Sequence, residues 1–195
     1  MGFQRHTGAD IHKSQISTAI QRVKIVGLTH NHNQAQNQDG FVVAMKSDSS
    51  LLNQRKPFFM PDSLGVITVT ECVAARICRL GKNIQPKFAA RYIDSYALAL
   101  DFLAEEKLSE SKWAEGFAFD NSLCVGTWVD AGDFPPDLLP VKPSIEDAVA
   151  AISRIMTIRT GDIIFIDTSV AREIKPEQVY TLYINNEENL YCKIK

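Results

Sequence analysis

The chain has 195 residues, of which 45% are hydrophobic and 23% charged, and these are the proportions of a globular protein. The net charge of −2 provides no basic surface for nucleic acid, and no apolar stretch is long enough to span a membrane, so neither is an expected partner. The four cysteines, Cys72, Cys78, Cys124 and Cys192, form no Cys-x-x-Cys pair, which indicates reduced thiols in a cytoplasmic protein.

Residues 1–22 are polar, with weak helical spacing at Ile11, Ile16 and Ile20, and we interpret them as an N-terminal extension. Residues 23–195 are expected to form a single domain. All the histidines lie near the start of the chain, at His6, His12, His30 and His32. Chemistry that needs a histidine must therefore use this N-terminal part or a partner subunit.

The first half of the domain shows mainly strand patterns. Val23–Gly27 and Phe41–Met45 predict two strands, which are separated by an Asn- and Gln-rich loop. A longer β-rich stretch runs through 66–73 and 76–78. Residues 86–91 suggest one or two turns of helix, whereas the apolar run 97–103 is compatible with either a strand or a helix.

The second half contains one clear helix. Ser144 offers a cap, acidic residues follow it, and apolar residues from Ile145 to Met156 form one stripe. Ile163–Ile166 predicts a buried strand, and the alternation between Val179 and Ile194, around a polar turn, predicts a closing hairpin. These elements together predict a strand-rich α+β domain.

Several stretches taken together resemble the short, single-domain branch of the fumarylacetoacetate hydrolase family. The stretches that carry the resemblance are Arg76–Ile84 with Phe88–Tyr92, Ala99–Ala104, Trp113–Ser122, Ile152–Phe165 and Tyr191–Lys195. The resemblance covers roughly residues 23–195 and depends on their order and spacing. It implies the family's mixed β-roll, usually found as a homodimer.

The resemblance also implies a chemistry. Members of this family bind Mg²⁺ or a similar cation through a Glu-x-Glu pair on one strand and an aspartate on another. The metal polarises a 2-oxo acid or β-diketone for hydrolysis, decarboxylation or tautomerisation. A lysine stabilises the developing enolate, and a histidine, usually with a glutamate, handles the water.

Most of these family positions are changed in the present sequence. Thr70 and Cys72 stand at the Glu-x-Glu positions, so that only Asp101 remains of the three metal ligands. Thr68 occupies a position that is often histidine, and Phe117 occupies the lysine position. We therefore expect no catalytic residues at these positions.

The changes extend to the walls of the pocket. The family's pocket-closing hairpin is expected to be missing, because residues 129–143 are proline-rich and too few for it. The late Thr-Gly-Thr-Pro loop becomes Ile166–Ser169, in which the Thr168 hydroxyl either contacts a ligand or bonds within a turn. Lys46 either lines the pocket or simply ends its strand in solvent.

One carboxylate beside a hydroxyl and a thiol matches a divalent cation poorly, so no cofactor is expected, or at most weakly bound Mg²⁺ or Mn²⁺. Cys72 is more consistent with a buried, inert thiol than with a nucleophile. The leading hypothesis is a non-catalytic binding or scaffold protein, homodimeric and cytoplasmic. The alternatives are a metal-dependent hydrolase, isomerase or decarboxylase of 2-oxo acids or β-diketones with an altered site, and a subunit that completes the site of a paralogue.

Overall fold

The computed structural model describes residues 23–30 and 40–195. The predicted extension, residues 1–22, lies outside the described residues, as do residues 31–39 of the predicted Asn- and Gln-rich loop. In the described part of the chain, no helix is both long and apolar enough to cross a membrane.

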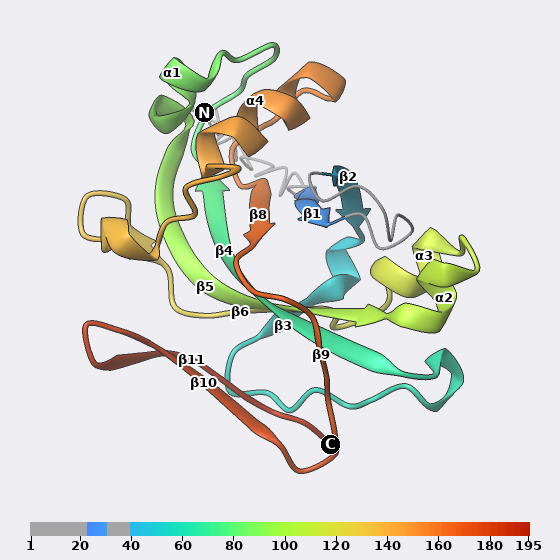
Figure 1. The fold of residues 1–195 in the computed structure, drawn as a ribbon. Coiled ribbons are helices and arrows are strands. Elements are labelled where there is room, and N and C mark those ends of the chain that lie inside the picture. Colours follow the sequence, from blue (N-terminus) through green and yellow to red (C-terminus); the bar gives the residue numbers. More distant parts are fainter. Residues whose placement is uncertain (1–22, 31–39) are drawn as a thin grey trace, which may run out of the picture.

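A strongly curved sheet of nine strands forms the centre of the fold (Figure 1). Its strands are β1 (Ile25–His30), β2 (Phe41–Lys46), β3 (Leu51–Asn53), β4 (Ile67–Ile77), β5 (Ile93–Ala104), β6 (Leu123–Val125), β7 (Val129–Asp130), β8 (Ile163–Asp167) and β9 (Arg172–Glu173). Their order is β2-β1-β8-β4-β5-β6-β3, with β7 on β5 and β9 on β4. The sheet is mixed, because β1 runs parallel to β8 and β3 runs parallel to β6.

The long strands β4 and β5 pair along almost their whole length and carry the curvature of the sheet. Residues 97–103, compatible with either element in the sequence, belong to β5 and are mostly buried on both faces. Burial of both faces explains why this run shows no alternation of apolar and polar residues. The two predicted β segments around residues 66–78 form the single strand β4.

Helices cover the two faces of the sheet separately. The longest helix, α4 (Ile145–Ile155), packs on one face beside the short α1 (Pro86–Ala89). The helices α2 (Glu105–Ser109) and α3 (Trp113–Phe117) pack on the opposite face. Short 3₁₀ turns complete the connections: η1 (Asp48–Ser50), η2 (Asp62–Leu64), η3 (Ala90–Tyr92) and η4 (Pro136–Leu138).

The predicted cap of α4 is confirmed. The Ser144 hydroxyl accepts a hydrogen bond from the Asp147 amide at 3.1 Å, and the Asp147 carboxylate accepts one from the Ser144 amide at 3.1 Å. This reciprocal capping box satisfies amide groups that a helix start otherwise leaves unpaired.

The predicted hairpin also forms, from β10 (Val179–Ile184) and β11 (Glu187–Lys193), and it closes the lower end of the fold in Figure 1. Asn185 and Asn186 turn the chain with φ values of 50° and 67°, in the left-handed region that asparagine tolerates well. The prediction of a strand-rich α+β domain with a mixed, curled sheet is confirmed.

Candidate functional site

One face of the curved sheet brings together the residues that the sequence resemblance aligns with the family's metal ligands. Thr70 on β4 lies directly opposite Asp101 on β5, and Cys72 lies opposite Asp167 on β8. Paired residues project to the same side of a sheet, as do residues two apart along one strand. Thr70, Cys72, Asp101 and Asp167 therefore share one face, and all four are buried.

A lysine ammonium meets the buried carboxylate. Lys46 at the end of β2 places Nζ 2.8 Å from Oδ1 of Asp101, and both side chains are 0% exposed. Burial raises the pKa of Asp101 to about 7, although the Lys46 charge acts to lower it. Burial likewise lowers the pKa of Lys46, against the opposing effect of Asp101. Lys46 is thus buried rather than solvated, and it is not among the residues that line the two cavities described below.

The Cys72 thiol lies beside the two carboxylates. Its Sγ donates to Oδ1 of Asp167 at 3.3 Å. Burial raises the pKa of Cys72 well above its ordinary value, and the charges of Asp167 and Asp101 raise it further. At neutral pH the group is a neutral thiol that donates a hydrogen bond, and it does not have the character of a nucleophile.

Asp167 contacts both the buried Cys72 thiol and the partly exposed residue His30. Its Oδ2 accepts hydrogen bonds from the Thr29 hydroxyl at 2.6 Å and from the His30 amide at 3.2 Å. The His30 ring is partly exposed, and its Nδ1 lies 3.5 Å from the same Asp167 oxygen. The sequence pattern did not single out Asp167 as a site residue, although the changed Ile166–Ser169 loop contains it.

His30 provides a test of this arrangement. The contact with Asp167 raises the pKa of His30 above its ordinary 6.5. The stabilisation from this contact is therefore fully present below about pH 6.5 and is lost as the pH rises through the higher folded-state pKa. In an NMR titration, Asp167→Asn should move the His30 midpoint down towards 6.5, whereas Thr29→Val should leave it raised. An unchanged midpoint in Asp167→Asn would contradict the contact.

An open cavity of about 680 Å³ adjoins Asp167, with Thr168 and Ser169 on the same wall. His30 and Phe41 line it as well, and residues 137–142 form a further wall. The interval 129–143 contains the two-residue strand β7 and the turn η4, and it forms no hairpin. The interval 129–143, which was expected to be too short for the family's hairpin, thus lines the open cavity beside Asp167 through residues 137–142.

Thr168 lines this cavity, but its hydroxyl and amide groups also fix the loop after β8 to strand β4. The Thr168 hydroxyl donates to the Glu71 carbonyl at 3.0 Å, and the Thr168 amide donates to the same oxygen at 2.7 Å. Thr68 lies away from the cavity lining, where its hydroxyl donates to the Glu105 carboxylate at 2.8 Å. Neither threonine therefore has the environment of an acid–base group.

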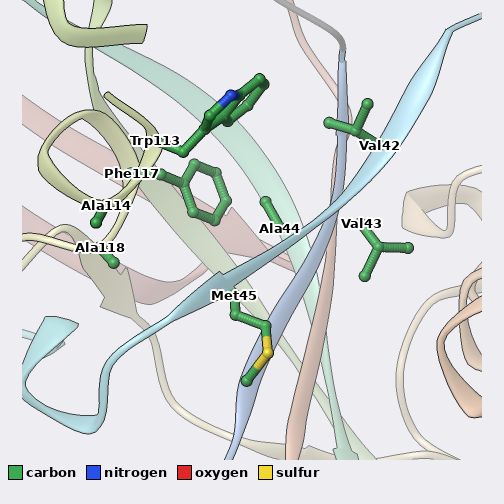
Figure 2. Close-up of a pocket in the computed structure, with 8 residues that line it drawn as sticks. All are labelled: Val42, Val43, Ala44, Met45, Trp113, Ala114, Phe117 and Ala118. Atoms are coloured by element: carbon green, nitrogen blue, oxygen red, sulfur yellow. The ribbon is translucent and has the colours of Figure 1, made fainter. Parts of the chain in front are cut away.

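Phe117, which the sequence resemblance aligns with a lysine of the family, covers the buried ion pair. Its ring centroid lies 4.0 Å from Nζ of Lys46 and 6.3 Å from the ring of Phe165. On its other side the ring lines a second, apolar cavity of about 370 Å³ between α3 and β2. Figure 2 shows Phe117 and Trp113 of α3 opposite Ala44 of β2 across this cavity.

Three donor atoms in this cluster are close enough together to contact one cation. Cys72, Asp101 and Asp167 each offer one donor atom, and these atoms lie within 4.8 Å of one another. The thiol is a soft ligand, however, whereas Mg²⁺ favours carboxylate oxygens. The Lys46 ammonium lies 2.8 Å from one oxygen of the Asp101 carboxylate. A buried thiol beside two carboxylates, one of them in an ion pair, fits a hard divalent cation poorly.

The chain has the strand-rich α+β fold, with a curled mixed sheet, of a known protein family. Its sequence matches the family described as fumarylacetoacetate hydrolase C-terminal over residues 17–143, which is well over half of its length. The chain belongs to this family. No curated protein sequence matches it.

Solved structures confirm the fold. A fumarylacetoacetate hydrolase family protein from Yersinia pestis CO92 superposes with a TM-score of 0.76 at 20% identity, covering 89% of this chain and 92% of that chain. Fumarylpyruvate hydrolase from Pseudomonas aeruginosa, in complex with Mn²⁺ and pyruvate, gives 0.74 at 18% identity and coverages of 89% and 88%. The 5-carboxymethyl-2-hydroxymuconate delta-isomerase from Mycobacterium smegmatis gives 0.73 at 18% identity and coverages of 88% and 78%.

Proposed function

We propose that this chain is a non-catalytic member of the fumarylacetoacetate hydrolase family that acts as a binding or scaffold protein. The burial of the three ligand positions carries the proposal: Thr70, Cys72 and Asp101 are at most 2% exposed. None of the three lines the open cavity beside Asp167. A metal that polarises a substrate must contact both its ligands and the substrate, and this enclosure separates the two.

The charges of the site support the same proposal. The sequence resemblance aligns Phe117 with the family's lysine, and an aromatic ring cannot stabilise an enolate as an ammonium does. The ammonium that is present, on Lys46, is neutralised by Asp101 and separated from the open cavity. The open cavity remains as a binding surface, with polar groups from His30, Thr168 and Ser169. We place the protein in the cytoplasm as a homodimer, as expected for the family.

The test is an assay with oxaloacetate, acylpyruvates and fumarylacetoacetate in the presence of Mg²⁺ or Mn²⁺. The expected rate is no higher than that of a metal-only control, since loss of one electrostatic stabiliser typically costs about 10²–10³ in rate and several groups are changed together here. Saturable turnover that disappears in Asp101→Asn would contradict the proposal. Turnover that survives this substitution would indicate a contaminating enzyme.

The alternative function is a metal-dependent hydrolase, isomerase or decarboxylase with an altered ligand set. The cluster of Cys72, Asp101 and Asp167 favours it, because three donor atoms converge within 4.8 Å. The Mn²⁺ in the Pseudomonas neighbour gives a precedent for a divalent cation in this fold. This alternative requires turnover that depends on added metal, so the same assay separates the two functions.

A further inference from the structure

Two segments at one end of the molecule carry basic side chains and no acidic ones. Residues 76–91 contain five Lys or Arg residues, residues 153–161 contain two, and neither segment contains Asp or Glu. Gly81 pairs with Ile158, and α1 packs beside α4 (Figure 1), so the two segments are neighbours in the fold. Six of these cations are exposed, and together we call them the basic patch: Arg79, Lys82, Lys87, Arg91, Arg154 and Arg159.

The charges of the basic patch are not neutralised within the described part of the chain. None of the six side chains forms an ion pair there. The acids that follow the two segments are already paired, Asp94 with Arg76 at 2.9 Å and Asp162 with Lys24 at 2.5 Å. Like charges that gather on one surface create a positive potential. The net charge of −2 averages over the whole chain and therefore did not reveal this patch.

Helix capping explains only two of the six cations. Lys82 donates to the Arg154 carbonyl at 3.0 Å, and Arg154 itself lies in the last turn of α4, where a cation is favourable. Within the described residues, the other four side chains donate no hydrogen bond to the rest of the chain. Intramolecular hydrogen bonding therefore does not account for their gathering at this end of the molecule.

Large apolar side chains are exposed in the same two segments. Leu80 is 67% exposed, Ile155 is 63% exposed and Phe88 is 39% exposed. The ring of Phe88 has the Lys87 ammonium and the Arg91 guanidinium each 5.0 Å from its centroid. Exposed apolar side chains that lie among charges are typical of a surface that binds another protein.

We propose that the basic patch is a docking surface for an acidic segment of another protein, one that also presents apolar side chains. Charge complementarity selects an acidic partner, and the exposed Leu80, Phe88 and Ile155 select apolar side chains on it. A second copy of this chain related by two-fold symmetry would place the patch against itself, with like charges opposed. Phosphates of a nucleic acid would match the cations and leave Leu80 and Ile155 without partners. The surface is separate from the cavity beside Asp167, so the proposal does not depend on the proposed function.

The test is an NMR titration of the ¹⁵N-labelled full chain at low salt with three probes: a synthetic peptide of glutamate and leucine, a glutamate and serine peptide of equal length and charge, and oligothymidylate. The glutamate and leucine peptide should shift the amide signals of residues 79–91 and 154–159, bind about tenfold more tightly than the serine peptide, and weaken as NaCl is added.

The variant Lys87→Glu/Arg91→Glu should weaken this binding by about tenfold or more. The matched control is Lys56→Glu/Lys175→Glu, which changes the net charge equally at two exposed lysines outside the patch and should leave the binding nearly unchanged. Equal losses in the two variants would overturn the proposal, because overall charge alone would then explain the binding. With the wild-type chain alone, either tighter binding of oligothymidylate or an absence of shifts in the two segments would also overturn it.

Discussion

Replacement of Asp101 by asparagine is expected to lower the free energy of unfolding by about 3–5 kcal/mol, because it leaves the Lys46 charge buried without its partner. Both side chains of the pair are 0% exposed, so water cannot replace the lost carboxylate. The measurement is urea-induced unfolding at pH 8, where a carboxyl group with a pKa of about 7 is mostly ionised. The double variant Lys46→Met/Asp101→Asn lacks the orphaned ammonium and should recover a substantial part of the loss.

An exposed ion pair provides the matched control for Asp101→Asn. Arg55 contacts Glu188 at 2.7 Å, but the Arg55 side chain is 71% exposed. Glu188→Gln should therefore cost no more than about 1 kcal/mol. Equal, small losses in Asp101→Asn and Glu188→Gln would mean that the Lys46–Asp101 pair is solvated in solution and is not a buried ion pair.

Truncation of Phe117 to alanine should also destabilise the fold strongly, by about 3–5 kcal/mol. The ring is buried, covers the Lys46 ammonium and already borders the apolar cavity between α3 and β2. Its removal would enlarge this cavity and join it to the ion pair. The loss thus combines missing dispersion contacts with a missing aromatic face for the cation.

The control for Phe117→Ala is Phe59→Ala, in which an equal number of atoms is removed from a side chain that is 68% exposed. This change should alter the free energy of unfolding by less than about 0.5 kcal/mol. Thermal or urea unfolding of the two variants gives the comparison. If Phe117→Ala were as mild as the control, the ring would not be part of the packed cover over Lys46.

Local signals in the sequence predicted much of the fold. The capped helix after Ser144 followed from the serine, the acidic first turn and the apolar stripe, which are all short-range features. The C-terminal hairpin followed from alternation around a polar turn. The strand at 97–103 could not be assigned, because a strand buried on both faces has the same composition as a buried helix.

The candidate site likewise has a part that the sequence predicted and a part that only the tertiary structure shows. Two of the aligned ligand positions, Thr70 and Cys72, share a face simply because they lie two residues apart on one strand. Lys46 was predicted only as a pocket residue or a solvated strand end. Its contact with Asp101 and the part played by Asp167 depend on which strands are neighbours and on the curl that brings the end of β2 to Asp101. A lysine at a strand end is usually solvated, and only the tertiary structure shows that this one is buried.

The central claim is that the buried cluster around Asp101 no longer holds the metal ion expected from the family, and a crystal structure of the wild-type chain grown with MnCl₂ and oxalate tests it most directly. The account predicts Nζ of Lys46 within ion-pair distance of Asp101 and no anomalous manganese signal at Thr70, Cys72, Asp101 or Asp167. A manganese peak bound to the Asp101 carboxylate would contradict it.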